Sequence, residues 1–178
     1  YVKFTGTLTT CSTTTPPPTS GIATGIAWGK TQLGTRYLGC AAGTYRLGNP
    51  TTIDRWHDGT TCGQTRVYFQ PANTIGYDCS GLMYAILKQS GITLAYTSSS
   101  SIKANVPAVS KSSLRPGDML AKDGHVVMYI GSHNGVNSVI ESTPYAQNSD
   151  GSWKGTRISG VQSFLDSSLY TAHRAQGL

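Results

Sequence analysis

The sequence predicts an α+β domain, in which helices come first along the chain and pack on a central antiparallel β-sheet. Two segments with helical periodicity lie in the first half, one beginning near Ser20 and one running from Cys79 to Gly91. The second half alternates short β-rich runs with turn signals, among which Asn134-Gly135 marks a hairpin. Helices followed by an antiparallel meander are typical of α+β folds.

The expected elements follow in order. The first helix starts near Ser20, a good N-cap residue, and stops near Gly34. Its apolar stripe consists of Ile22, Ala23, Ile26, Ala27 and Leu33. The second helix begins at Cys79, buries one apolar face and ends at Gly91. Strands are expected at residues 67–69, 119–120, 125–130, 138–142, 156–158 and 170–174, the last two at sheet edges.

The domain organisation is simple. Residues 1–19 are rich in Thr and Pro and predict an extended arm or linker. Residues 20–178 are long enough to form one domain with its own core. Residues 38–76 show no sustained periodicity and are rich in Gly, Pro, Thr and Asn, so they predict a long loop insertion within that domain.

The composition favours an extracellular protein. Only 12% of the residues are charged, whereas about a quarter is usual in soluble domains. The net charge of +6 favours an anionic partner such as a cell wall. Lys and Arg are scattered singly, so no nucleic-acid partner is expected. No apolar run approaches the roughly 20 residues of a membrane span.

The four cysteines are Cys11, Cys40, Cys62 and Cys79, and none forms a C-x-x-C pair, which argues against structural zinc. We expect Cys79 to remain a thiol, so the other three can form at most one intramolecular disulfide. A Cys40–Cys62 bond is our preference because both lie in the Gly-rich insertion. Pairing of Cys11 with either one stays open.

Cys79 is the candidate nucleophile because it lies in the first turn of a predicted helix. A helix N-terminus stabilises a thiolate through its dipole and its N–H groups. The backbone N–H of Cys79 is expected to contribute to oxyanion stabilisation. Asp78 and Ser80 flank the nucleophile, and each is either a helix-start residue or a substrate-binding residue.

A cysteine nucleophile needs a base within hydrogen-bonding reach, and His125 is the best-placed histidine. It begins a strongly apolar strand directly after an Asp-Gly turn, and a polar ring at the head of a buried strand requires a reason. We expect the other histidines, His57, His133 and His173, to be structural or exposed.

The base in turn needs an orienting partner on its own face of the sheet. If His133-Asn134-Gly135 forms a three-residue loop, Glu141 lies opposite Val127 and shares the face of His125, about 7 Å along the strand. A two-residue turn would place Glu141 on the other face. We prefer Glu141, and Asn137 is the alternative.

Four segments then point to a family. They are Gly34-Thr-Arg-Tyr37, Tyr77-Asp-Cys-Ser-Gly81, Arg115-Pro-Gly-Asp118 and Gly124-His-Val-Val-Met-Tyr-Ile-Gly131. In this order, over residues 20–178, the chain resembles the NlpC-type peptidoglycan cysteine peptidases, which have a compact papain-like fold. The stretch between Tyr37 and Cys79 is longer than is usual in that family.

The resemblance implies a role for each matching residue. Cys79 would be the nucleophile, His125 the base, Glu141 the third catalytic residue, and Tyr37, Asp78 and Ser80 substrate-binding residues. The implied reaction is cleavage between D-γ-glutamate and the following diamino acid. We therefore expect a secreted, wall-associated monomer that acts on peptidoglycan or muropeptides without metal or cofactor.

Two alternatives remain open. A Cys-His amidase that cuts between muramic acid and L-alanine would use the same chemistry in a different groove. A non-catalytic wall-binding domain would keep the fold without turnover.

Overall fold

The computed structural model describes residues 21–37, 55–57, 67–69, 76–95, 98–147 and 153–178. The predicted arm lies outside the described residues, as do most of the 38–76 insertion and the cysteines Cys11, Cys40 and Cys62 with their expected disulfide.

The main sheet has six strands in the order β5-β10-β6-β7-β8-β9, and each neighbouring pair is antiparallel. The strands are β5 (Ala108–Val109), β6 (Met119–Lys122), β7 (His125–His133), β8 (Val136–Gln147), β9 (Trp153–Gly160) and β10 (Thr171–His173). The edge placement is right for β9. It is wrong for β10, which lies between β5 and β6 because the two-residue strand β5, which gave no sequence signal, covers its outer side.

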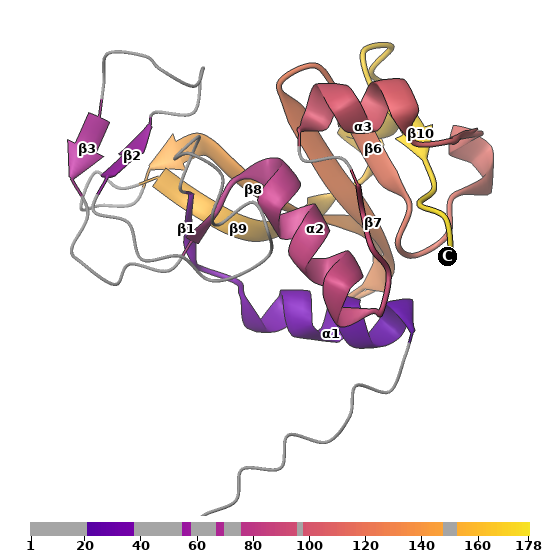
Figure 1. Cartoon of the computed structure of the whole chain (residues 1–178), viewed down its shortest axis with the longest axis horizontal. Coiled ribbons are helices and arrows are strands. Elements are labelled where there is room, and N and C mark those ends of the chain that lie inside the picture. The colour runs from indigo at the N-terminus through magenta and orange to yellow at the C-terminus, as the bar shows by residue number, and fades with distance from the viewer. Residues whose placement is uncertain (1–20, 38–54, 58–66, 70–75, 96–97, 148–152) are drawn as a thin grey trace, which may run out of the picture.

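Helices cover the sheet. They are α1 (Ile22–Thr31), α2 (Cys79–Gln89), α3 (Ser99–Asn105) and the short α4 (Gln162–Asp166), with a 3₁₀ helix η2 (Lys111–Ser113). Figure 1 shows α1 beside α2, with α2 crossing in front of β7. Two small sheets complete the described part: β1 (Arg36–Tyr37) parallel to β4 (Gly76–Tyr77), and β2 (Arg55–His57) antiparallel to β3 (Val67–Phe69). The expected α+β class is confirmed.

The sheet buries both of its faces. The larger core lies under α1, α2 and α3 and includes Ile26, Leu82, Met83, Ile86, Ile102, Met119, Val126, Met128 and Ile140. The smaller core lies on the other face and includes Leu120, Val127, Val139, Val161, Tyr170 and Ala172. Consecutive residues such as Val126 and Val127 go to different cores, as the two-residue period of a strand requires.

Helix α1 packs on α2 through two glycines, and of the predicted stripe only Ile22 and Ile26 reach the core. Its N-cap is Gly21, and Ser20 lies outside the described residues. Leu33 is 43% exposed, whereas Gly25 and Gly29 are buried against Ile86 of α2. A side chain at either glycine would meet Ile86, so these two residues permit the close approach of α1 to α2.

We therefore expect Gly25→Ala to destabilise the protein. The added methyl group would overlap with the Ile86 carbonyl oxygen and with Ser90 Oγ, so α1 must shift, at a cost of about 1–3 kcal/mol in the free energy of unfolding. Urea denaturation measures this loss. Gly160→Ala is the matched control, because no atom lies within 4 Å of a methyl group there. Equal stability of the two variants would contradict the close helix contact.

Candidate active site

Cys79 is the first residue of α2, the position expected from the sequence. Asp78 is the N-cap, and its Oδ1 accepts a 2.6 Å hydrogen bond from the backbone N–H of Gly81. This cap explains why the helix begins here, since an aspartate in the extended conformation satisfies one of the donors that a helix start leaves unbonded. Cys79 is 7% exposed and forms no disulfide.

The strand before the nucleophile is held from several sides. In β4, Tyr77 pairs with Tyr37 of β1, and its carbonyl oxygen accepts a 2.6 Å hydrogen bond from Ser142 Oγ of β8. The Tyr77 hydroxyl donates to Gln32 Oε1 at 3.1 Å, and burial raises the pKa of this tyrosine. Two residues of chain span about 7 Å at most, so these contacts fix the start of α2 close to the part of β8 that carries Glu141.

His125 and Glu141 form a buried pair. His125 Nε2 lies 2.9 Å from Glu141 Oε2, and the two side chains are only 3% and 2% exposed. A carboxylate can only accept a hydrogen bond, so the imidazole must donate from Nε2. In the neutral ring the remaining nitrogen, Nδ1, is then the basic one. A basic Nδ1 is able to accept a proton from a donor on that side of the ring.

Glu141 lies on the face of His125 for a reason that differs from the expected one. The hairpin turn has two residues, Asn134 and Gly135, both with positive φ, rather than three. A two-residue turn alone would put Glu141 on the opposite face. However, the register shifts between Tyr129 and Gly131, and this bulge returns the ladder to the register of the three-residue loop.

The second carboxylate oxygen of Glu141 is bonded to β9. Arg157 Nε donates to Oε1 at 3.0 Å and Ser159 Oγ donates to the same atom at 2.8 Å. Burial alone would raise the pKa of Glu141. The hydrogen bond and charge of His125, the bond from Ser159 and the charge of Arg157 outweigh that effect, and the pKa lies below its ordinary value of 4.5. Neither β9 residue was identified from the sequence: Arg157 lies in the strand expected at 156–158, whereas Ser159 lies one residue beyond it.

An aromatic ring packs against His125 as well. The rings of His125 and Tyr170 meet edge to face with centroids 6.5 Å apart, and Lys122 Nζ lies 5.3 Å from the Tyr170 centroid. The Phe164 ring also packs edge to face on the Tyr170 ring, with the two centroids 5.2 Å apart. These contacts limit the freedom of the imidazole and help to bury it.

The expected substrate-binding residues are buried, whereas Asn137, the alternative third catalytic residue, is exposed. Tyr37 is buried on β1, and Asp78 and Ser80 are buried beside the nucleophile, where Ser80 Oγ donates to Asp78 Oδ1 at 3.2 Å. This geometry accounts for Asp78 as a helix cap. Asn137, the alternative third residue, is exposed at the far end of the hairpin and accepts from the Tyr129 hydroxyl at 3.2 Å.

The other histidines have local roles where they are described. His173 is buried and donates from Nδ1 to the Val106 carbonyl at 2.8 Å, so its Nε2 accepts from the Thr171 hydroxyl at 2.7 Å in the neutral ring. His133 is half-buried at the hairpin end, 3.5 Å from Asn134 Nδ2. Of His57, only its backbone in β2 is described.

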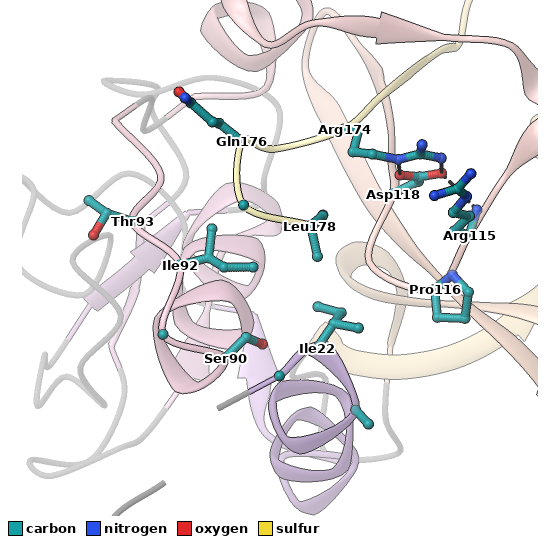
Figure 2. A pocket seen from close by; sticks show the side chains of 14 residues that line it. Ile22, Ser90, Ile92, Thr93, Arg115, Pro116, Asp118, Arg174, Gln176 and Leu178 are labelled. Carbon is teal, nitrogen blue, oxygen red and sulfur yellow. Dashed lines mark hydrogen bonds and ion pairs between the residues drawn. The ribbon is translucent and has the colours of Figure 1, made fainter. Parts of the chain in front are cut away.

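The Arg115-Pro-Gly-Asp118 segment forms a structural turn. The buried Asp118 accepts from the backbone N–H of Arg115 at 2.7 Å and from Arg174 Nε and Nη2, each at 2.7 Å. The Asp118 hydrogen bond and charge raise the pKa of Arg174. This pair borders a cavity of about 810 Å³ that is otherwise lined mainly by residues at the N-terminus of α1, the end of α2 and the C-terminal segment (Figure 2). The cavity does not include Cys79, His125 or Glu141.

Within the described residues, no cluster of three His, Cys, Asp or Glu side chains could hold a metal ion. In the same part of the chain, no helix is long and apolar enough to cross a membrane.

The low pKa of Glu141 can be measured directly, because Glu141 is the only glutamate in the chain. Protein labelled with ¹³C at the glutamate carboxyl carbon gives a single NMR signal, and we expect its titration midpoint to lie below 4.5 in the native state. Because the native pKa is depressed, the carboxylate stabilises the fold above the unfolded pKa and loses this effect as the pH falls through the native pKa. A native midpoint at or above that of the urea-unfolded chain would contradict the buried pair.

Comparison with known sequences identifies relatives. A family model described as the NlpC/P60 family matches residues 57–161, more than half of the chain. The peptidoglycan endopeptidase RipA of Mycolicibacterium smegmatis is 34% identical over 94 residues. That match covers 51% of this chain and 18% of RipA, so the chain spans less than a fifth of that relative.

Solved structures share the fold. The P60 domain of an M. avium paratuberculosis antigen has a TM-score of 0.56 at 23% identity, covering 86% of this chain and 92% of that domain. The peptidoglycan hydrolase RipB of Mycobacterium tuberculosis has a TM-score of 0.53 at 23% identity, and the match covers 86% of this chain and 63% of RipB. RipD of the same organism is a non-catalytic NlpC/p60 domain protein adapted to peptidoglycan binding. It has a TM-score of 0.56 at 21% identity, and the match covers 88% of this chain and 97% of RipD. The fold is therefore the papain-like fold of these domains, and the matched segment shows that the chain belongs to the NlpC/P60 family.

Proposed function

We propose that this chain is a cysteine endopeptidase that hydrolyses the stem peptide of bacterial peptidoglycan, with Cys79 as nucleophile, His125 as base and Glu141 as the residue that orients the base. One observation carries the proposal. The buried 2.9 Å contact between His125 Nε2 and Glu141 Oε2 leaves Nδ1 as the basic nitrogen of the ring, while Cys79 stands at the helix start that favours a thiolate.

In the acylation step, His125 Nδ1 takes the proton of Cys79 Sγ, and the thiolate attacks the carbonyl carbon of the scissile bond. The carbonyl oxygen becomes an oxyanion, which the backbone N–H of Cys79 stabilises at the start of α2. The imidazolium then returns its proton to the leaving amine, and the C–N bond breaks. The negative charge of Glu141 stabilises the imidazolium while it exists.

Deacylation follows the same route with water as the nucleophile. His125 Nδ1 accepts a proton from water as the oxygen attacks the thioester carbon. The collapse of the second tetrahedral intermediate releases the carboxylic acid, and the Cys79 sulfur leaves as a thiolate. The imidazolium then returns this proton to Cys79 Sγ, which restores the starting protonation states, and no metal or cofactor enters the proposed cycle.

The bond that we propose is the one between D-γ-glutamate and the diamino acid, and the substrate is peptidoglycan or its muropeptides outside the cell. Membership of the NlpC/P60 family supports this substrate class, as does the similarity to the endopeptidase RipA. The net charge of +6 favours an anionic wall. Tyr37, Asp78 and Ser80 are the proposed contacts of the stem peptide.

A wall-binding domain without turnover is the second candidate. The fold is shared with RipD, which is non-catalytic, so the fold alone does not separate the two functions. The side chains at positions 79, 125 and 141 favour turnover. A domain that only binds peptidoglycan needs neither a thiol at a helix start nor a buried His–Glu pair.

We expect purified protein to release fragments from defined muropeptides, identified by mass spectrometry, with cleavage after D-glutamate. Cys79→Ala and His125→Ala should reduce cleavage to background, because each removes a group that forms or breaks a bond. Glu141→Gln should lower kcat by about 10²–10⁴-fold, because an amide can hold the ring in the wrong tautomer and cannot offset the imidazolium charge.

His133→Ala is the matched control for His125→Ala, since it removes a histidine from the other end of the same strand and should leave cleavage unchanged. A product with free sugar and an intact stem peptide would identify the amidase instead. Absence of all products, together with slow alkylation of Cys79 by iodoacetamide at neutral pH, would identify the binding domain.

A further inference from the structure

Two side chains of β9 converge on one oxygen of Glu141. Glu141 is directly opposite Arg157 in the β8–β9 ladder, and Ser159 lies two residues further along β9, so all three share a face of the sheet. Arg157 Nε and Ser159 Oγ both donate to Oε1, at 3.0 and 2.8 Å, while Oε2 faces His125. The two carboxylate oxygens therefore serve different strands.

We propose that Arg157 and Ser159 are positioning residues, which hold Glu141 as an acceptor-only carboxylate and thereby fix His125 in the tautomer that serves as base. The inference rests on the proposed function for its catalytic consequence. Its structural content, control of the charge of Glu141 and of the His125 tautomer, does not depend on turnover.

The tautomer argument follows from hydrogen-bond chemistry. With two donors on Oε1, a proton on that atom would displace one of them. A proton on Oε2 would make Glu141 a donor toward Nε2, and the neutral ring would then carry its hydrogen on Nδ1. A ring protonated at Nδ1 cannot accept the thiol proton at that atom. Keeping Glu141 ionised is therefore equivalent to keeping the base competent.

Burial makes these two donors necessary. Glu141 is 2% exposed, and a buried carboxylate without sufficient donors tends to become neutral. Arg157 is 40% exposed, so it brings a charge from the solvent side to a buried acceptor, and Ser159 adds a neutral donor. Among the described residues, the other charged or titratable groups near the His125–Glu141 pair are Lys122 of β6 over the Tyr170 ring, Tyr170 itself, and Cys79, the proposed proton donor to His125.

The test separates charge from hydrogen bonding. We expect Arg157→Gln to raise the titration midpoint of the single ¹³C-glutamate signal by about one pH unit, because an adjacent arginine lowers a carboxyl pKa by one to three units. The acid limb of kcat/KM should move upward in parallel, by the same shift as the glutamate midpoint, whereas kcat at neutral pH, where Glu141 stays ionised, should change little. Arg157→Lys, which keeps the charge, should restore most of the midpoint.

Ser159→Ala should raise the same midpoint by a smaller amount, and the double variant Arg157→Gln/Ser159→Ala by more than either. ¹⁵N NMR of the His125 ring reports the tautomer, and the double variant should lose the signature of a hydrogen on Nε2. Arg115→Gln is the matched control: it removes one positive charge from an exposed site at the turn before β6 and should change none of these readouts.

A double variant that stays folded with unchanged glutamate midpoint, ring tautomer and pH profile would overturn the proposal. Circular dichroism establishes the folded state, and Ser159→Ala, a small change, provides a second test if the double variant unfolds. If the wild-type protein cleaves no muropeptide, the proposed function fails. The two NMR readouts then still decide whether Arg157 and Ser159 control Glu141.

Discussion

The buried hydrogen bond between His125 and Glu141 is the constraint on which the rest of the site depends. A charged carboxylate that leaves water costs several kcal/mol unless the protein supplies donors in its place. Here the donors come from two neighbouring strands: His125 from β7, and Arg157 and Ser159 from β9. The strand order β7-β8-β9 allows this, since a glutamate on the central strand of the three can accept hydrogen bonds from both neighbouring strands.

The position of that glutamate depends on two irregularities that offset each other. The tight Asn134-Gly135 turn shifts the β7–β8 pairing by one residue relative to a three-residue loop, and the bulge after Tyr129 shifts it back. The sequence does not distinguish a three-residue loop without a bulge from a two-residue turn with a bulge, because both arrangements place Val127 opposite Glu141. The expected partner of His125 was thus reached from an incorrect turn. Gly131, with a φ of 76° directly after the bulge, was the available signal.

Local signals in the sequence predicted much of the fold. Asp78 and the apolar face after it marked the start of α2, and the apolar runs and turns marked β6 to β9. The remaining features depend on contacts between distant segments. Gly25 resembles a weak point in a helix until Ile86 lies against it, and Arg157 resembles a surface residue until β9 is in register with β8. Strand β10 could be recognised, but its interior position required β5, which has only two residues.

Strand β8 connects the two halves of the proposed catalytic machinery through adjacent residues. Neighbouring side chains of a strand point to opposite faces. Glu141 binds His125 on one face, and Ser142 on the other donates to the carbonyl of Tyr77, two residues before the nucleophile. The start of α2 and the His125 ring are thus both held by one short segment of β8. The same segment therefore contacts both the proposed base and the strand that leads to the proposed nucleophile, although Cys79 and His125 lie 46 positions apart in the sequence.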